Sequence, residues 1–154
     1  MDARLISGTA HVTASGTRVG MTKSQGETCV RLLRELPPGA EFHHGDCKGV
    51  DAEFHNLVRQ TVGSATLIHI HPPTLKKDRA FCESEPVSTV VYDAKDYLKR
   101  NHVMVDACNV VFAFPRSRVE QKRGSGTWAV IRYAKKTGKK CVLVFPCGDT
   151  EIRE

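Results

Sequence analysis

Residues 124–127, with the sequence Gly-Ser-Gly-Thr, lie between an apolar segment and a helical pattern. Glycines in such a loop let the backbone come close to a phosphate, and the first N–H groups of the following helix can then donate to it. The hydroxyls of Ser125 and Thr127 add two donors. A simple turn with a helix N-cap has the same sequence, and the spacing is neither that of a Walker A loop nor that of the dinucleotide fingerprint. The loop therefore predicts either a phosphate site or a capped turn.

Polar residues also follow other expected strands. Residues 15–18 (Ser-Gly-Thr-Arg) end with a guanidinium suited to bidentate phosphate recognition. In residues 45–49, Asp46 could bind ribose hydroxyls or cap a helix, and Lys48 could offset phosphate charge. An Asx turn and a surface arginine are the structural alternatives. The candidate ligand-binding residues are Ser15, Gly16, Thr17, Arg18, Gly45, Asp46, Lys48, Gly49, Arg100, Asn101, Gly124, Ser125, Gly126 and Thr127.

Histidines and a cysteine raise the question of a metal. The residues are His43, His44, Cys47, His69 and His71. Their spacing matches no zinc pattern, so we predict no metal site and no cofactor. A nucleophilic pair of Cys47 with His44 or His71 is equally without support from the spacing.

Short apolar runs alternate with helical patterns along the chain. The runs at 10–14, 40–44, 65–70, 109–114 and 140–145 predict strands, and helices are expected at about 23–36, 50–61, 93–106 and 127–136. Thr22 is a suitable N-cap for the first helix. Residues 74–88 show no period and predict a long loop. This alternation predicts one α/β domain over residues 1–154, with a doubly wound sheet of about five parallel strands and its ligand crevice at the carboxyl ends of those strands.

Composition excludes several classes of protein. The 154 residues are 40% hydrophobic and 26% charged, as in a globular domain, and no apolar run is long enough for a membrane span. The six cysteines form no C-x-x-C pair, and residues 1–4 begin no secretory signal, so we expect a cytoplasmic protein with reduced thiols. A net charge of +6 indicates either a basic, solvated surface or a polyanionic partner.

The order of these segments resembles the SLOG superfamily, which contains the DNA-processing protein DprA, the LOG proteins and small YspA-type proteins. The resemblance covers about residues 10–146 and is greatest to the YspA-like branch. It rests on the segments 15–18, 44–52 (HGDCKGVDA), 97–106 (YLKRNHVMVD) and 124–128 (GSGTW). It implies a Rossmann-like three-layer sandwich that binds a nucleotide or a nucleotide-derived ligand at the strand ends, and homo-oligomers are common among its members.

LOG proteins hydrolyse the N-glycosidic bond of nucleoside 5′-monophosphates, and this chain departs from their pattern. Arg100 and Met104 match the LOG arginine and methionine, but Asn101 replaces a lysine and Val130 stands where a helix glutamate is expected. Glycosidic cleavage needs a carboxylate. The candidates are Asp46, Asp51, Glu53 and Asp106, of which Asp46 is favoured because it should project from a strand end.

Three functions follow as hypotheses. The first is a sensor or sequestering module for a nucleoside phosphate, ADP-ribose or an NAD-like ligand. The second is a nucleotide N-glycosidase that uses Asp46. The third is nucleic-acid binding in the manner of DprA, which the scarcity of aromatic residues (6%) disfavours. We expect a homo-oligomer, with an apolar interface on the helix near residues 97–105, and no membrane partner.

Overall fold

The computed structural model describes residues 9–84 and 88–154. Residues 1–4, on which the expected localisation depended, and residues 85–87 of the expected loop lie outside the described residues. The elements are β1 (His11–Gly16), α1 (Lys23–Arg34), β2 (Glu41–His44), α2 (Val50–Thr61), β3 (Ile68–Ile70), β4 (Thr89–Val91), α3 (Tyr97–Ala107), β5 (Val110–Phe114), α4 (Gly126–Lys136), β6 (Lys140–Val144) and β7 (Thr150–Arg153). Two 3-10 turns, Lys76–Asp78 and Cys82–Ser84, precede β4. Among the helices of the described residues, none is long and apolar enough to cross a lipid bilayer.

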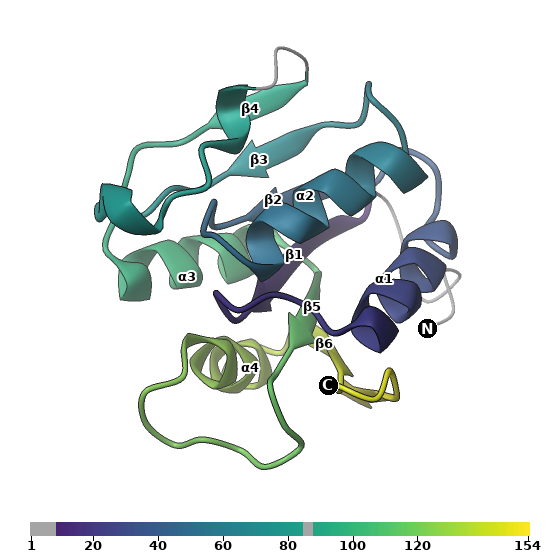
Figure 1. Cartoon of the computed structure of the whole chain (residues 1–154), viewed down its shortest axis with the longest axis vertical. Helices are drawn as coiled ribbons and strands as arrows, with labels where there is room; N and C mark the ends of the chain where they lie inside the picture. Colours follow the sequence, from purple (N-terminus) through teal and green to yellow (C-terminus); the bar gives the residue numbers. More distant parts are fainter. Residues whose placement is uncertain (1–8, 85–87) are drawn as a thin grey trace.

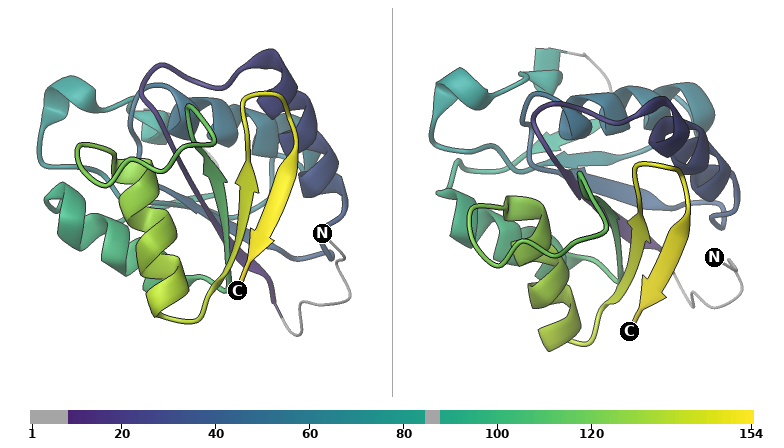
Figure 2. Two further views of the ribbon diagram at one scale, coloured as in Figure 1. Left: turned by 90° about the horizontal axis from the view of Figure 1, so that it is seen from below. Right: turned by 60° about the horizontal axis from the view of Figure 1, so that its bottom comes forward.

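The strands form one sheet in the order β4-β3-β2-β1-β5-β6-β7. Neighbouring strands are parallel except for β6 and β7, which are antiparallel. Helices α1 and α2 pack together on one face, and α3 and α4 pack together on the other (Figures 1 and 2). These three layers confirm the expected α/β class and the Rossmann-like, mostly parallel sheet.

The sheet has seven strands, so the expectation of about five was too low. β4 has only three residues and lies next to the aperiodic segment that was expected to be a loop. β7 is an edge strand of sequence TEIR, and three of its four residues are exposed. Neither strand buries enough apolar surface to produce a hydrophobic run, which is the signal that sequence analysis detects.

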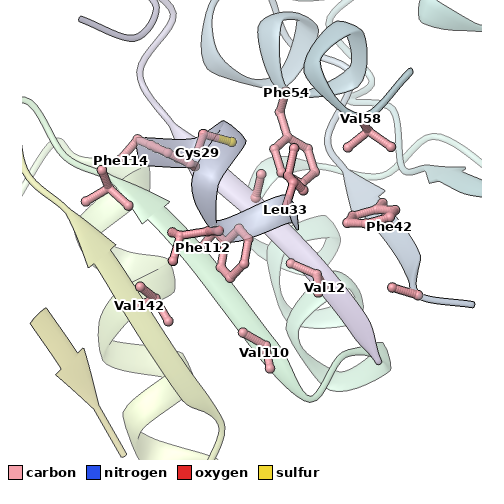
Figure 3. Packing of buried hydrophobic residues seen from close by; sticks show 14 of the residues in the cluster. Val12, Cys29, Leu33, Phe42, Phe54, Val58, Val110, Phe112, Phe114 and Val142 are labelled. Carbon is pink, nitrogen blue, oxygen red and sulfur yellow. The ribbon is translucent and has the colours of Figure 1, made fainter. Parts of the chain in front are cut away.

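The larger core lies between the sheet and the helices α1 and α2 (Figure 3). Val12, Phe42 and Phe112 project toward these helices from β1, β2 and β5. Phe42 meets Phe54 of α2 edge-on, with ring centroids 5.9 Å apart. Because side chains alternate along a strand, this packing fixes which residues point to the opposite face of the sheet.

Helix α1 is attached to the strand ends beside the site. Thr22 is its N-cap, as predicted: the Thr22 hydroxyl accepts from the Gln25 N–H, and the Gln25 side chain accepts from the Thr22 N–H, both at 3.0 Å. The buried Gln25 amide also donates to the carbonyls of Pro115 (3.0 Å) and Val144 (2.9 Å). One polar side chain thus holds the carboxyl ends of β5 and β6 together.

Helix α3 begins four residues later than expected, because Asp96 is its N-cap and accepts from the Lys99 N–H at 3.0 Å. Met104 and Val105 are buried within this chain, so they are unavailable for the expected apolar interface between subunits. Leu98 is 64% exposed and is the large apolar side chain that α3 presents to solvent.

Candidate functional site

A cavity of about 740 Å³ opens at the carboxyl ends of β1 and β5. The chain runs outward from β1 through β2, β3 and β4, and then returns to β5 on the other side of β1. These two strands therefore form the switch point of the sheet, where ligands of open α/β sheets bind. The cavity is lined by most of the predicted residues, namely Ser15, Gly16, Thr17, Arg18, Arg100, Asn101, Gly124, Ser125, Gly126 and Thr127.

Helix α4 begins at the wall of this cavity. Its N-cap is Ser125, whose hydroxyl accepts from the Trp128 N–H at 3.2 Å. The capped turn, which was the structural alternative to a phosphate site, is thus present, and the Ser125 hydroxyl already accepts a hydrogen bond from the helix backbone. The positive end of the helix dipole and the first N–H groups remain suited to an anion. A Cβ added at Gly124 or Gly126 would meet no atom within 4 Å, so there is open space beside this backbone.

Arginines from three parts of the chain line the cavity. Arg18 follows β1, has a side chain that is 56% exposed, and lies 3.4 Å from Asp78. Arg100 is buried; its Nη1 donates to the Gly45 carbonyl at 3.0 Å, and its Nε and Nη2 donate to the Asn101 side chain. Arg116 follows β5 and is exposed. The buried charge of Arg100 and the two exposed guanidinium groups of Arg18 and Arg116 favour an anionic ligand.

Asp51 is a buried carboxyl in the wall of the cavity. Its Oδ2 accepts from the Cys47 N–H at 3.1 Å. Burial raises the pKa of Asp51 to about 6, although the charge of Arg100 and backbone N–H donors oppose the shift. A carboxyl that titrates near neutral pH beside a cavity can act as a general acid or base.

Residues 45–49 are placed differently from the expectation. Asp46 is fully buried; it accepts from Arg79 Nε and from the Cys82 N–H, each at 2.9 Å. The Lys48 N–H donates to the Asp78 carbonyl at 2.9 Å. Gly45, Asp46, Lys48 and Gly49 do not line the cavity. This turn instead binds the segment that contains the two 3-10 turns.

Close packing explains two of the predicted glycines. Gly49 has φ +91°, and a Cβ there would lie 2.4 Å from the Thr17 carbonyl oxygen. A Cβ at Gly16 would lie 2.5 Å from Val50. The turn after β1 therefore lies directly against the start of α2, which brings Asp51 to the cavity.

Sequence reasoning missed Tyr97 and Arg116 in the cavity wall, and it favoured Asp46 over Asp51. The Tyr97 ring lies about 5 Å from both Arg18 and Arg100, at 5.2 and 5.1 Å respectively. Tyr97 is three residues before Arg100, so both side chains lie on one face of α3. This spacing could have placed Tyr97 beside Arg100 from the sequence. Arg116 lies two residues after the predicted strand 109–114. Ligands of open α/β sheets bind at the carboxyl ends of the strands, so Arg116 could also have been predicted as a site residue.

The histidines considered for a metal are split between the two faces of the sheet. His44 is buried and bonds to His55 of α2 at 3.0 Å. His43, His69 and His71 lie together on the opposite face, where His43 Nδ1 is 2.9 Å from His71 Nε2. Burial, reinforced by the nearby His69, lowers the pKa of His43 to about 2.

No protein-family model matches the chain, and no curated protein matches it in sequence. Similar folds occur among solved structures. DNA processing protein A from Helicobacter pylori, described for its single-stranded DNA binding mode, is 19% identical with a TM-score of 0.62, covering 92% of this chain and 68% of its own. DNA processing protein A (DprA) from Streptococcus pneumoniae is 17% identical with a TM-score of 0.64, covering 88% of this chain but only 50% of its own. The molybdenum cofactor binding protein from Rippkaea orientalis is 16% identical with a TM-score of 0.63, covering 91% of this chain and 78% of its own. At these identities the likeness concerns the fold.

Proposed function

We propose that this chain is a member of the SLOG superfamily, near its YspA-like branch, and that it binds a nucleotide or nucleotide-derived phosphorylated ligand as a sensor or sequestering module. One observation carries the proposal: the N-terminus of α4 and the turn after β1 meet at one cavity that Arg18, Arg100 and Arg116 also line. The volume of about 740 Å³ lies within the roughly 300–1,000 Å³ of small-molecule sites.

The ligand phosphate belongs at the start of α4. Gly124 and Gly126 leave open space there, and the helix N–H groups and Arg116 supply donors. The guanidinium groups of Arg18 and Arg100 lie over the Tyr97 ring, so a base would stack on the exposed guanidinium plane of Arg18 and not on the ring itself. Asn101 and Asp51 are then available to ribose hydroxyls. A cofactor binding protein and two DNA processing proteins with this fold support ligand binding in general.

A ligand screen by thermal shift tests this proposal. The panel contains nucleoside mono-, di- and triphosphates, ADP-ribose and NAD, with inorganic phosphate alone as the reference. A ligand at one hundred times its dissociation constant stabilises the fold by about 2.7 kcal/mol. The proposal fails if no member of the panel binds below millimolar concentration in a calorimetric titration.

Arg18→Ala and Arg31→Ala form a matched pair for that titration. Both side chains are about half exposed (56% and 54%), both form a surface ion pair, and both substitutions remove one charge. Arg18 lines the cavity, whereas Arg31 lies on α1. We expect Arg18→Ala to weaken binding on the order of tenfold or more, as for a charge-assisted bond, and Arg31→Ala to bind as the wild type does.

Hydrolysis of a nucleoside monophosphate is a second candidate, favoured by the buried Asp51 carboxyl in the cavity wall. The reaction breaks the C1′–N bond; water gives its hydroxyl to C1′ and its proton to the departing base. Asp51 would assist as the carboxylate that this chemistry requires. Chromatography should then detect free base with the wild type and with Asp106→Asn, an exposed carboxyl, but not with Asp51→Asn. Product from Asp51→Asn would remove this residue from the mechanism.

Single-stranded DNA binding is a third candidate, because it is the described property of the Helicobacter pylori neighbour. Binding of an oligonucleotide would weaken steeply with salt, since each neutralised phosphate releases counterions. A ligand held in the cavity would compete with the oligonucleotide only if both use the same site. Competition between a mononucleotide and a labelled oligonucleotide therefore separates this candidate from the first.

A further inference from the structure

Three histidines gather on the sheet face that is turned away from α1 and α2. We define the histidine cluster as His11, His43 and His69, which come from β1, β2 and β3. The strand register explains the gathering: Thr13 pairs with His43, and His43 pairs with His69. His11 lies two residues before Thr13, so its side chain points to the same face. One nitrogen from each ring can be chosen so that all three lie within 4.8 Å of one another.

We propose that the histidine cluster binds one divalent transition-metal ion, with Zn²⁺ as the reference ion. Imidazole nitrogens are preferred ligands of such ions. At a tetrahedral Zn²⁺, two nitrogens that are each about 2.0–2.1 Å from the ion lie roughly 3.3 Å apart. The distance between His11 Nδ1 and His43 Nε2 is already 3.2 Å. The remaining pairs need to close by no more than about 1.5 Å to reach that geometry.

The outer nitrogens of two rings are held by other side chains. His43 Nδ1 lies 2.9 Å from His71 Nε2, and His69 Nδ1 lies 2.8 Å from the Tyr92 hydroxyl. Histidines that bind metals commonly donate their second N–H in this way, which directs the first nitrogen at the ion. In the metal-bound form, Nδ1–H of His43 and of His69 would donate outward, and the Nε2 atoms of these two rings would hold the ion together with Nδ1 of His11.

Glu41 places a carboxylate at the opening of the cluster. Its Oε1 is 2.7 Å from His69 Nε2, and its Oε2 is 3.9 Å from His11 Nε2. The side chains of Glu41 and His11 are 28% and 32% exposed, so an ion can enter from solvent and keep a fourth position for water or this carboxylate. When an ion binds, the proton between His69 and Glu41 moves from Nε2 to Nδ1 of His69, which frees Nε2 for the ion and lets Nδ1–H donate to the Tyr92 hydroxyl.

A second group of possible ligands, His44, His55 and Cys82, is a useful contrast. His44 Nδ1 accepts from the Asp46 N–H at 2.9 Å, so the ring proton is on Nε2, which donates to His55 Nδ1 at 3.0 Å. His44 therefore has no lone pair available for a metal. The histidine cluster has no such backbone donor among the hydrogen bonds of the described residues.

His11 is the first residue of β1, and His43 and His69 lie level with Thr13 in the middle of that strand. None of the three lines the cavity, which opens beyond Ala14 at the carboxyl ends of β1 and β5. Metal binding by the cluster therefore does not depend on a ligand in the cavity. An ion here would join three strands of the sheet and raise the melting temperature, because it binds the folded chain and not the unfolded one.

Calorimetric titration of Zn²⁺ into the untagged protein tests the proposal, with Co²⁺ absorption as a spectroscopic check of nitrogen ligation. The background is Cys147→Ser, because the exposed Cys147 thiol can itself bind Zn²⁺. We expect one ion per chain. His11→Ala and His69→Ala should each lower the affinity at least tenfold, and Tyr92→Phe should lower it on the order of tenfold. His102→Ala, a partly buried histidine of α3 stacked on Tyr133, is the control and should bind as the background does.

If a variant of a buried histidine fails to fold, Glu41→Gln still tests the proposal, because the Glu41 side chain is partly exposed. It should fold and bind Zn²⁺ more weakly. The proposal is overturned if the background protein binds no ion, if His11→Ala and Glu41→Gln bind as tightly as the background, or if His102→Ala loses affinity equally. Nucleotide titrations of the same variants should remain unchanged, which keeps this test separate from that of the cavity.

Discussion

Asp51 accepts a hydrogen bond from the Cys47 N–H, 3.1 Å away, where the turn after β2 enters α2. This contact fixes a buried carboxyl at the wall of the cavity, next to the turn after β1. The position depends on Gly49, where only a glycine fits against the Thr17 carbonyl. The close packing at Gly49 and the carboxyl group of Asp51 thus belong to the same short segment.

The pH dependence of stability should change in Asp51→Asn. Burial raises the pKa of Asp51 from 3.8 to about 6, so the folded chain holds this proton more tightly than the unfolded chain does. Its contribution to stability is present below about pH 4 and is lost as pH rises through 6, by about 3 kcal/mol in total. Urea unfolding from pH 4 to 7 should show Asp51→Asn gaining on the wild type over that window. If the free energies of unfolding of the two proteins differed by the same amount at every pH, the raised pKa of Asp51 would be contradicted.

The ion pair of Asp46 and Arg79 should matter far more for stability than an exposed pair of the same kind. Asp46 is fully buried, whereas Asp149, which pairs with Arg118, has a side chain that is 71% exposed. Asp46→Ala leaves Arg79 Nε and the Cys82 N–H without their acceptor, although Arg79 Nη2 still donates to Glu83, and should cost about 3 kcal/mol. Asp149→Ala should cost less than about 1 kcal/mol. Equal free energies of unfolding for the two variants would show that Asp46 does not hold the segment before β4.

Two glycine substitutions should separate packing from ligand binding. Gly16→Ala places a Cβ 2.5 Å from Val50 and should destabilise the fold by about 1–3 kcal/mol. Gly126→Ala meets no atom within 4 Å, so the melting temperature should hardly change. Its methyl group would nevertheless occupy the space in which a phosphate approaches α4. Calorimetry should therefore show weaker nucleotide binding by Gly126→Ala, and unchanged affinity would argue against a phosphate at that position.

The strand-to-helix alternation predicted the fold class and the edge of the sheet at which the cavity lies. Val12, Phe42 and Phe112 belong to apolar runs that any strand analysis detects. β4 and β7 escaped detection because they are short and largely exposed. Local capping was also predictable, since the N-cap at Thr22 depends only on residues three positions apart.

Side-chain direction within the loops was not predictable in the same way. Asp46 was expected in the cavity, yet it points to Arg79, a partner 33 residues later in a segment without periodicity. The histidine cluster likewise depends on strand register, because its members are about 30 residues apart in sequence and meet only across neighbouring strands. Zinc patterns in sequence record short spacings, so this arrangement has no local signature.

A crystal structure with the tightest-binding nucleotide tests the central claim most directly. We predict a phosphate about 3 Å from the backbone nitrogens at the start of α4, with a guanidinium of Arg18 or Arg116 on the same group. A nucleotide bound elsewhere on the chain, with the loop 124–127 free of phosphate, would contradict it.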